Sequence, residues 1–234
     1  MRTTNNFWKR LRARLHGHQA LTPKPVRPYR RGPSIFLVVE GINDIHFLRR
    51  ISAILHVDDP RLPDLSTMES RGELIFVPFG GGDLSLWKDR LAGLSRAELH
   101  LYDREMPPET EARQRIVDAV NRRPRCRAFL TKKRSLENYL SPDAIREAGA
   151  VDISFSDHDY VAELVARQMH KRLDGQPSWL DLPSRRRKRR RDRAKKWLNS
   201  RAVERMTPGR LAERDPEDEV RCWLATIARL AGRV

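Results

Sequence analysis

The sequence has little cysteine and no long hydrophobic run. Its 234 residues include two cysteines, Cys126 and Cys222, which lie far apart in the chain. Two isolated cysteines provide neither a disulfide framework nor a zinc site, and they fit a reducing compartment, so we expect a cytoplasmic protein. No apolar run approaches the roughly eighteen residues that a membrane span requires. The sequence therefore predicts neither a disulfide-rich secreted domain nor an integral membrane protein.

Acidic residues are in the minority, and none precedes Glu40. Lys and Arg total 47 against 31 Asp and Glu, which gives a formal net charge of +16. A surplus of this size predicts a polyanionic partner. Nucleic acid, either DNA or RNA, is the first expectation, ahead of an anionic membrane surface. Residues 1–33 combine basic side chains with a proline-rich stretch, which indicates a basic arm and linker.

The hydrophobic pattern becomes regular after residue 33. Apolar runs of strand length, rich in β-branched residues, are typical of strands buried on both faces of a parallel sheet. These runs cover residues 34–40, 73–79, 97–103 and 126–131, and helical patterns lie between them at 41–55, 83–94 and 107–120, with a loop at 57–72. This alternation predicts an α/β domain at 34–150 with a mainly parallel four-stranded sheet. Helical patterns alone follow, so we expect a basic helical C-terminal extension at 151–234.

Acidic side chains gather at the predicted ends of the first and third strands. Glu40 ends the first strand, Asp44 lies in the first turn of the following helix, and Asp103 and Glu105 leave the third strand. Ligands bind beyond the carboxyl ends of the strands in open parallel sheets, so we expect these four carboxylates to converge. Packed carboxylates repel one another, and oxygen ligands without Cys or clustered His select Mg²⁺ or Mn²⁺. The alternative is that each acid only caps a helix or pairs with an arginine.

A dense basic run occupies residues 185–196. It could grip a phosphate backbone, with an affinity that falls steeply as salt rises. The alternative is a solvated block of charge. We favour nucleic-acid contact because acids are nearly absent from the run. The predicted contact residues are Arg185, Arg186, Arg187, Lys188, Arg189, Arg190, Arg191, Lys195 and Lys196.

Several motifs resemble one known family. EGINDIHFL at 40–48 resembles the EGxxD motif that opens a TOPRIM domain, and LYDRE at 101–105 resembles the second motif of that family, usually DxD. RSLENYL at 134–140 is similar to the segment that follows the sheet in the TOPRIM domains of OLD-family (overcoming lysogenization defect) nucleases. The stretch at 215–227 resembles their closing helix. The chain departs from the pattern at Glu105, where the family usually has Asp.

This resemblance implies a Rossmann-like TOPRIM fold and a Mg²⁺-dependent or Mn²⁺-dependent endonuclease, in a setting of bacterial anti-phage defence or mobile elements. Glu40, Asp103 and Glu105 would be the catalytic, metal-holding residues. Asp44 and Glu137 would serve a second metal ion. Whether one metal ion or two are bound is left open by the sequence.

The resemblance has further implications for partners and for phosphate binding. Lys133, or its neighbour Lys132, would steady the scissile phosphate. OLD-family proteins usually carry an ATPase, but no G-x-x-x-x-G-K-[ST] motif occurs in this chain, so we expect any ATPase to be a separate protein. Two alternatives stay open: a non-catalytic nucleic-acid-binding partner of such an ATPase, and a primase-like nucleotidyl transferase. The oligomeric state is open as well, a homodimer included.

Overall fold

A computed structural model describes residues 32–80, 83–149, 151–173 and 175–233. The described chain from Gly32 onward forms one compact unit. The predicted basic arm at 1–33 lies outside the described residues, apart from its last two positions. Within the described ranges, no helix combines the length and the apolar character that crossing a membrane requires.

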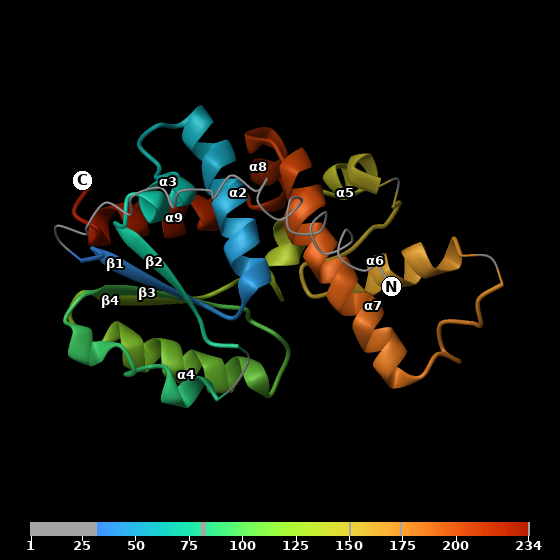
Figure 1. Ribbon diagram of the computed structural model, residues 1–234, viewed down its shortest axis with the longest axis horizontal. Coiled ribbons are helices and arrows are strands. Elements are labelled where there is room, and N and C mark those ends of the chain that lie inside the picture. Colours follow the sequence, from blue (N-terminus) through green and yellow to red (C-terminus); the bar gives the residue numbers. More distant parts are fainter. Residues whose placement is uncertain (1–31, 81–82, 150, 174, 234) are drawn as a thin grey trace, which may run out of the picture. The chain divides into compact units, whose positions relative to one another are not determined.

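The four predicted strands form one sheet. They are β1 (Ile35–Val39), β2 (Leu74–Pro78), β3 (Ala97–Tyr102) and β4 (Cys126–Leu130), in the spatial order β2-β1-β3-β4. Every neighbouring pair is parallel, so the predicted α/β class with a parallel four-stranded sheet is confirmed, and the arrangement is Rossmann-like (Figure 1). All five residues of β1 are buried because this strand is central and covered on both faces.

Helices cover both faces of the sheet. Figure 1 shows α2 (Ile42–Asp58) and α9 (Glu219–Leu230) on one side and α4 (Glu109–Asn121) on the other. Successive residues of β1 alternate between the two faces. Leu37 therefore belongs to the larger core, with α2 and α9, whereas Val38 belongs to the smaller core between the sheet and α4.

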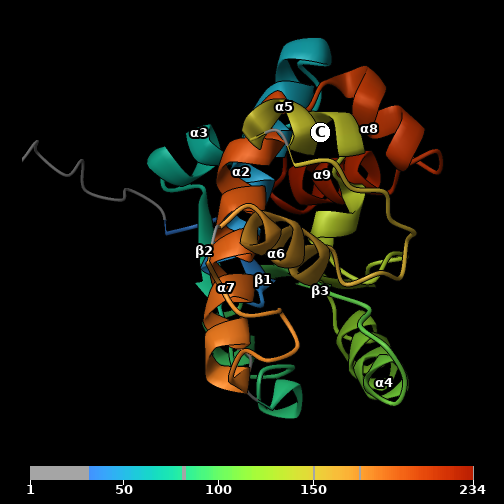
Figure 2. The same cartoon turned by 90° about the vertical axis from the view of Figure 1, so that its right-hand side faces the viewer.

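The chain continues as helices after β4, as predicted for the C-terminal part. They are α5 (Pro142–Gly149), α6 (Val161–Lys171), α7 (Ser184–Trp197) and α8 (Pro208–Arg214), followed by α9. Figures 1 and 2 both show α6 and α7 side by side. Apolar residues of these helices, such as Ile145 and Val165, join the same core as the sheet residue Leu37. One hydrophobic core thus extends across the predicted boundary at residue 150.

One predicted helix is wrong. Residues 83–94 form two short 3₁₀ turns, Leu84–Leu86 and Ala92–Leu94, instead of a helix. Neither turn has a buried residue, and the side chain of Leu86 is 67% exposed. A short helix depends on tertiary packing of an apolar face, and here Leu84, Trp87 and Leu91 pack against the smaller core but stay only half-buried.

One predicted loop contains a helix. The 57–72 segment includes α3 (Leu65–Ser70). The Asp64 side chain caps it, because its Oδ1 accepts a hydrogen bond from the Ser66 amide at 2.9 Å. Leu65 and Met68 are fully buried against the core. A side-chain cap and two apolar anchors therefore stabilise a helix of six residues.

Candidate metal centre

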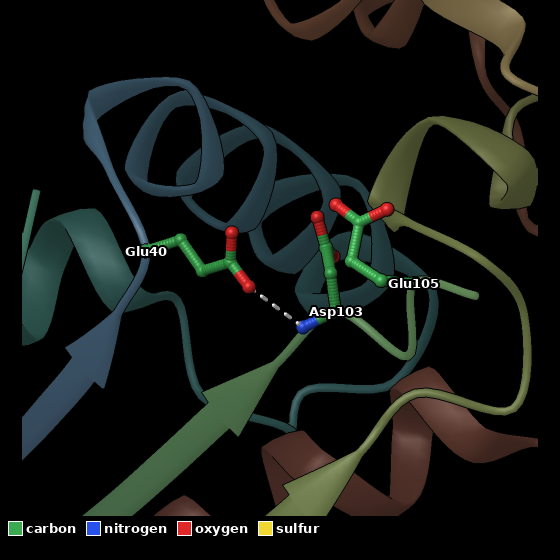
Figure 3. A group of neighbouring side chains, drawn as sticks. All are labelled: Glu40, Asp103 and Glu105. Atoms are coloured by element: carbon green, nitrogen blue, oxygen red, sulfur yellow. Dashed lines mark hydrogen bonds between the residues drawn. The ribbon is translucent and has the colours of Figure 1, made fainter. Parts of the chain in front are cut away.

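Glu40 lies directly beyond the carboxyl end of β1, where the sequence placed it. Its Oε1 accepts a hydrogen bond from the Asp103 amide at 3.3 Å, drawn as the dashed line in Figure 3. The Arg113 guanidinium of α4 contacts the same oxygen and also donates to the Asp103 carbonyl at 2.7 Å. Arg113 therefore ties the end of β1 to the end of β3.

Asp103 follows β3 and is 3% exposed. Its Oδ1 accepts a hydrogen bond from the Leu136 amide at 3.2 Å. Its Oδ2 is buried and has no hydrogen-bond partner among the described residues. Buried carboxylate oxygens normally accept a hydrogen bond, so an oxygen without a donor is available to a cation.

Glu105 reaches the same place through an unusual backbone conformation. Its φ of 54° lies in the left-handed region, which non-glycine residues seldom adopt. Its amide donates to the Arg134 carbonyl at 3.0 Å, and Arg134 Nε lies 3.6 Å from its Oε2. The sequence predicted that Glu105 converges with Asp103, and the structure brings them together through this left-handed residue. Such conformations concentrate at functional sites, because the surrounding structure has to enforce them.

The three carboxylates turn toward one another beyond the strand ends (Figure 3). One oxygen from each of Glu40, Asp103 and Glu105 lies within 4.8 Å of the other two. Two oxygens on opposite sides of a Mg²⁺ ion are about 4.2 Å apart, given metal–oxygen distances of about 2.1 Å. An all-oxygen donor set at this spacing, with one buried orphaned oxygen, fits a hard divalent cation.

Asp44 and Glu137 lie close by but already have hydrogen-bond donors. The Gly41 amide, at the start of α2, donates to Asp44 Oδ2 at 2.8 Å. Ser135 Oγ donates to Glu137 Oε2 at 2.7 Å, and Asn199 Nδ2 donates to Glu137 Oε1 at 2.5 Å. The structure thus brings three of the five predicted metal ligands together and binds the other two to the chain itself.

A lysine from the basic helix enters this site. Lys195, near the end of α7, places its Nζ 3.8 Å from Asp103 Oδ2 and 3.7 Å from Glu137 Oε1. The sequence assigned Lys195 to nucleic-acid contact on the outside of the helix. Instead, its side chain turns toward the carboxylates, so the site contains its own cation. Nothing in the linear pattern relates Lys195 to Glu137, because their approach depends on how α7 packs.

Burial and mutual repulsion shift the titration of this group. Burial raises the pKa of Asp44 to about 7, and the Lys195 ammonium opposes that rise. Burial also raises the pKa of Asp103 well above its ordinary value, and the Glu40 carboxylate adds to the effect. The Glu137 carboxylate in turn raises the pKa of the Lys195 ammonium. These directions agree, because several carboxylates share one ammonium and therefore favour extra protons or a further cation.

The lysines predicted to steady a phosphate lie elsewhere. Lys133 Nζ is 2.6 Å from Asp157 Oδ1 and lies over the Tyr139 ring, 5.6 Å from its centroid. Lys132 pairs with Glu217. The structure therefore brings neither ammonium to the three-carboxylate group, and Lys195 lies there instead.

The basic run forms α7, whose exposed end leads away from the site. Figure 1 shows α7 running from the lower right of the view toward α2. Among the nine predicted contact residues, Arg187, Arg190 and Arg191 are half-buried; Arg191 pairs with Glu163 at 3.1 Å. The exposed ones are Arg185, Arg186, Lys188, Arg189 and Lys196. The helix thus presents a basic outer face, and its Lys195 side chain lies next to the carboxylates of Asp103 and Glu137.

Comparisons of the chain with protein-family models, with curated proteins and with solved structures found no match. The resemblance to TOPRIM domains stays a prediction that rests on the motifs. The geometry supports only the coarser statement that Glu40, Asp103 and Glu105 form a group able to hold a metal ion.

Proposed function

We propose that the protein is a Mg²⁺-dependent nuclease that hydrolyses phosphodiester bonds in DNA or RNA. The observation that carries the proposal is the three-carboxylate group, with the buried and orphaned Asp103 Oδ2, at the carboxyl ends of adjacent parallel strands. Ligand sites of open α/β sheets occur at this edge. The motif resemblance to OLD-family TOPRIM domains favours the same activity, in anti-phage defence or mobile-element biology.

The chain's own residues have distinct roles in this proposal. Glu40, Asp103 and Glu105 would hold the cation, Mg²⁺ or Mn²⁺. A divalent cation bound there would supply an activated water and stabilise charge on the phosphate. Arg113 orients Glu40 through its contact with the carboxylate. Lys195 is positioned to attract a phosphate oxygen, because its ammonium lies against Asp103 at the edge of the group.

The basic outer face of α7 supports a nucleic-acid substrate. Lys and Arg side chains attract the phosphate backbone without reading its sequence. The exposed residues Arg185, Arg189 and Lys196 lie on the helix that also carries Lys195. A backbone that follows α7 would therefore pass toward the carboxylates.

Cleavage assays test the proposal against its two alternatives. Labelled single-stranded and double-stranded DNA and RNA are incubated with the purified chain and Mg²⁺, Mn²⁺ or EDTA. We expect cleavage with metal and none with EDTA. Glu40→Gln should cleave at least about 100-fold more slowly, because a metal ligand is lost. Glu111→Gln, an exposed change on α4, is the matched control and should cleave like the wild type.

Other outcomes would replace the nuclease assignment. Nucleic-acid binding without cleavage, with either metal, would favour the non-catalytic partner of a separate ATPase. Nucleotide incorporation on a single-stranded template would favour a primase-like transferase. Cleavage by Glu40→Gln at the wild-type rate would remove the three-carboxylate group from the mechanism.

A further inference from the structure

The ammonium of Lys195 lies between two of the five carboxylates predicted to hold metal, Asp103 and Glu137. It is 3.7 Å from Glu137 Oε1 and 3.8 Å from Asp103 Oδ2. Asp44 and Glu40 also act on it electrostatically. A second divalent cation bridging Asp103 to Asp44 or Glu137 would therefore need the space and the negative charge that Lys195 already takes.

The two outer carboxylates are oriented by protein donors rather than left open. Both oxygens of Glu137 accept hydrogen bonds, from Ser135 Oγ and Asn199 Nδ2. Asp44 turns its Oδ2 to the Gly41 amide. In contrast, Asp103 Oδ2 has no hydrogen-bond donor among the described residues. Among these three residues, only Asp103 keeps a buried oxygen without a hydrogen-bond donor in the described chain, and the Lys195 ammonium lies 3.8 Å from it.

The fold fixes the backbone of α7 at Lys195. A π-helical segment, Leu198–Ala202, directly follows α7 and packs against α2 and α5. Asn199 in this segment bridges the two partners, because its Nδ2 donates both to the Lys195 carbonyl at 2.9 Å and to Glu137. Trp197 packs so closely on Gly149 that a Cβ there would lie 2.7 Å from its Cζ2. Single π-helical turns of this kind are frequent at functional sites.

We propose that Lys195 replaces the second metal ion, so that the site binds a single divalent cation on Glu40, Asp103 and Glu105. The inference rests on the metal site of the proposed function and specifies its stoichiometry. An ammonium among the same carboxylates repels a second divalent cation and offsets the negative charge that would attract one. Lys195 also links the site to α7, so one helix carries both the built-in cation and the basic outer face.

Counting bound Mn²⁺ tests this without measuring activity. Free Mn²⁺ is titrated against the full chain, without nucleic acid, and followed by its room-temperature electron paramagnetic resonance signal. We expect one Mn²⁺ per wild-type chain and two per chain of Lys195→Met, because the carboxylates lose their ammonium. Lys195→Arg keeps the charge and should bind one. Lys171→Met, which removes an exposed lysine from the end of α6, is the matched control and should also bind one.

The outcomes separate this inference from the proposed function. Two Mn²⁺ of similar affinity in the wild type would overturn the single-ion site while leaving a metal-dependent nuclease intact. A folded Lys195→Met that still binds one Mn²⁺ would also overturn it. No bound Mn²⁺ in the wild type would overturn the metal site itself and the proposed function with it. Circular dichroism shows whether Lys195→Met folds; if it does not, the wild-type count alone decides.

Discussion

Two buried carboxylates belong to the same part of the sheet and have opposite surroundings. Glu98 lies within β3 and is 1% exposed, and Asp103 lies just beyond β3 and is 3% exposed. Glu98 accepts a hydrogen bond from Arg123 Nη1 at 3.2 Å and lies 2.8 Å from His100 Nε2. Asp103 keeps one oxygen without a hydrogen-bond donor among the described residues. Glu98 and Asp103 are therefore almost equally buried, and they differ in the hydrogen-bond partners of their carboxylates.

The two carboxyl groups titrate in opposite directions for this reason. Burial alone would raise the pKa of Glu98, but hydrogen bonds from His100 and Arg123 bring it below its ordinary value. Burial raises the pKa of Asp103 well above its ordinary value, and the Glu40 carboxylate raises it further. Depth in the fold thus does not distinguish a structural carboxylate from a candidate ligand. What distinguishes Asp103 is an oxygen without a hydrogen-bond donor in the described chain, among several carboxylates that share one ammonium, Lys195.

The hydrogen-bond partners of Glu98 indicate the role of its carboxylate. His100 Nδ1 lies 2.7 Å from Tyr102 Oη, so three alternate residues of β3 form one hydrogen-bonded row. Arg123, just after α4, joins this row and also contacts the Lys88 carbonyl. The network therefore links β3 to the segment before it, at Lys88, and to the segment after α4, at Arg123. We assign it a structural role.

The strongest test of this contrast is to neutralise the structural carboxylate. Glu98→Gln should lower the free energy of unfolding by about 3 kcal/mol, because it breaks a buried ion pair and leaves Arg123 with only the exposed Asp89 as a charged partner. Urea unfolding followed by circular dichroism measures the change. Asp103→Asn is the matched control and should not destabilise the metal-free protein. A loss below about 1 kcal/mol for Glu98→Gln would show that the two carboxylates do not differ as described.

The contrast also explains what the sequence could predict. The first strand was expected at 34–40 and lies at Ile35–Val39, because an uninterrupted apolar, β-branched run suits a strand buried on both faces. Glu40 and Asp103 were expected together because the carboxyl ends of neighbouring parallel strands share one edge. Both expectations depend on local pattern and on a general rule of sheet topology.

Local patterns and sheet topology could not predict contacts between residues far apart in the sequence. Asn199 and Glu137 are 62 positions apart, and only the docking of α7 and its π-helical end brings them together. The sequence therefore assigned Lys195 to nucleic-acid contact, together with the other basic residues of the 185–196 run. The row formed by Glu98, His100 and Tyr102 was missed for another reason. The alternation of polar Glu98, His100 and Tyr102 is visible in the sequence, because every second residue of a strand lies on the same face. The sequence does not show that Arg123, which lies outside the strand, pairs with Glu98.

A metal titration sharpens the comparison at the candidate ligand. Mg²⁺ at about 100 times its dissociation constant should stabilise the wild type by about 2.7 kcal/mol, because it binds the folded state alone. Asp103→Asn should lose this stabilisation, since the orphaned oxygen is removed. Glu98→Gln should keep it, although its baseline is lower. Thermal unfolding with Mg²⁺ or EDTA measures both. A Mg²⁺ response in Asp103→Asn equal to that of the wild type would separate Asp103 from the metal site.

The pH dependence of stability should have opposite signs at the two places. The pKa of Asp44, beside Asp103, is raised to about 7 in the folded chain from an ordinary value of 3.8, so the folded state binds the extra proton between these values. Its contribution is complete below about pH 4 and is lost as pH rises through 7, at most about 1.4 kcal/mol per pH unit. The lowered pKa of Glu98 gives the reverse, because its contribution to stability is lost only as the pH falls below the ordinary Glu pKa of 4.5.

Urea unfolding in EDTA between pH 5 and 8 should therefore show wild-type stability falling, and Asp44→Asn should make that slope shallower while Glu98→Gln leaves it in place. The raised pKa of Asp103 keeps part of the slope in Asp44→Asn. A rising slope in the wild type over this range would mean that Lys195 outweighs the burial of Asp44.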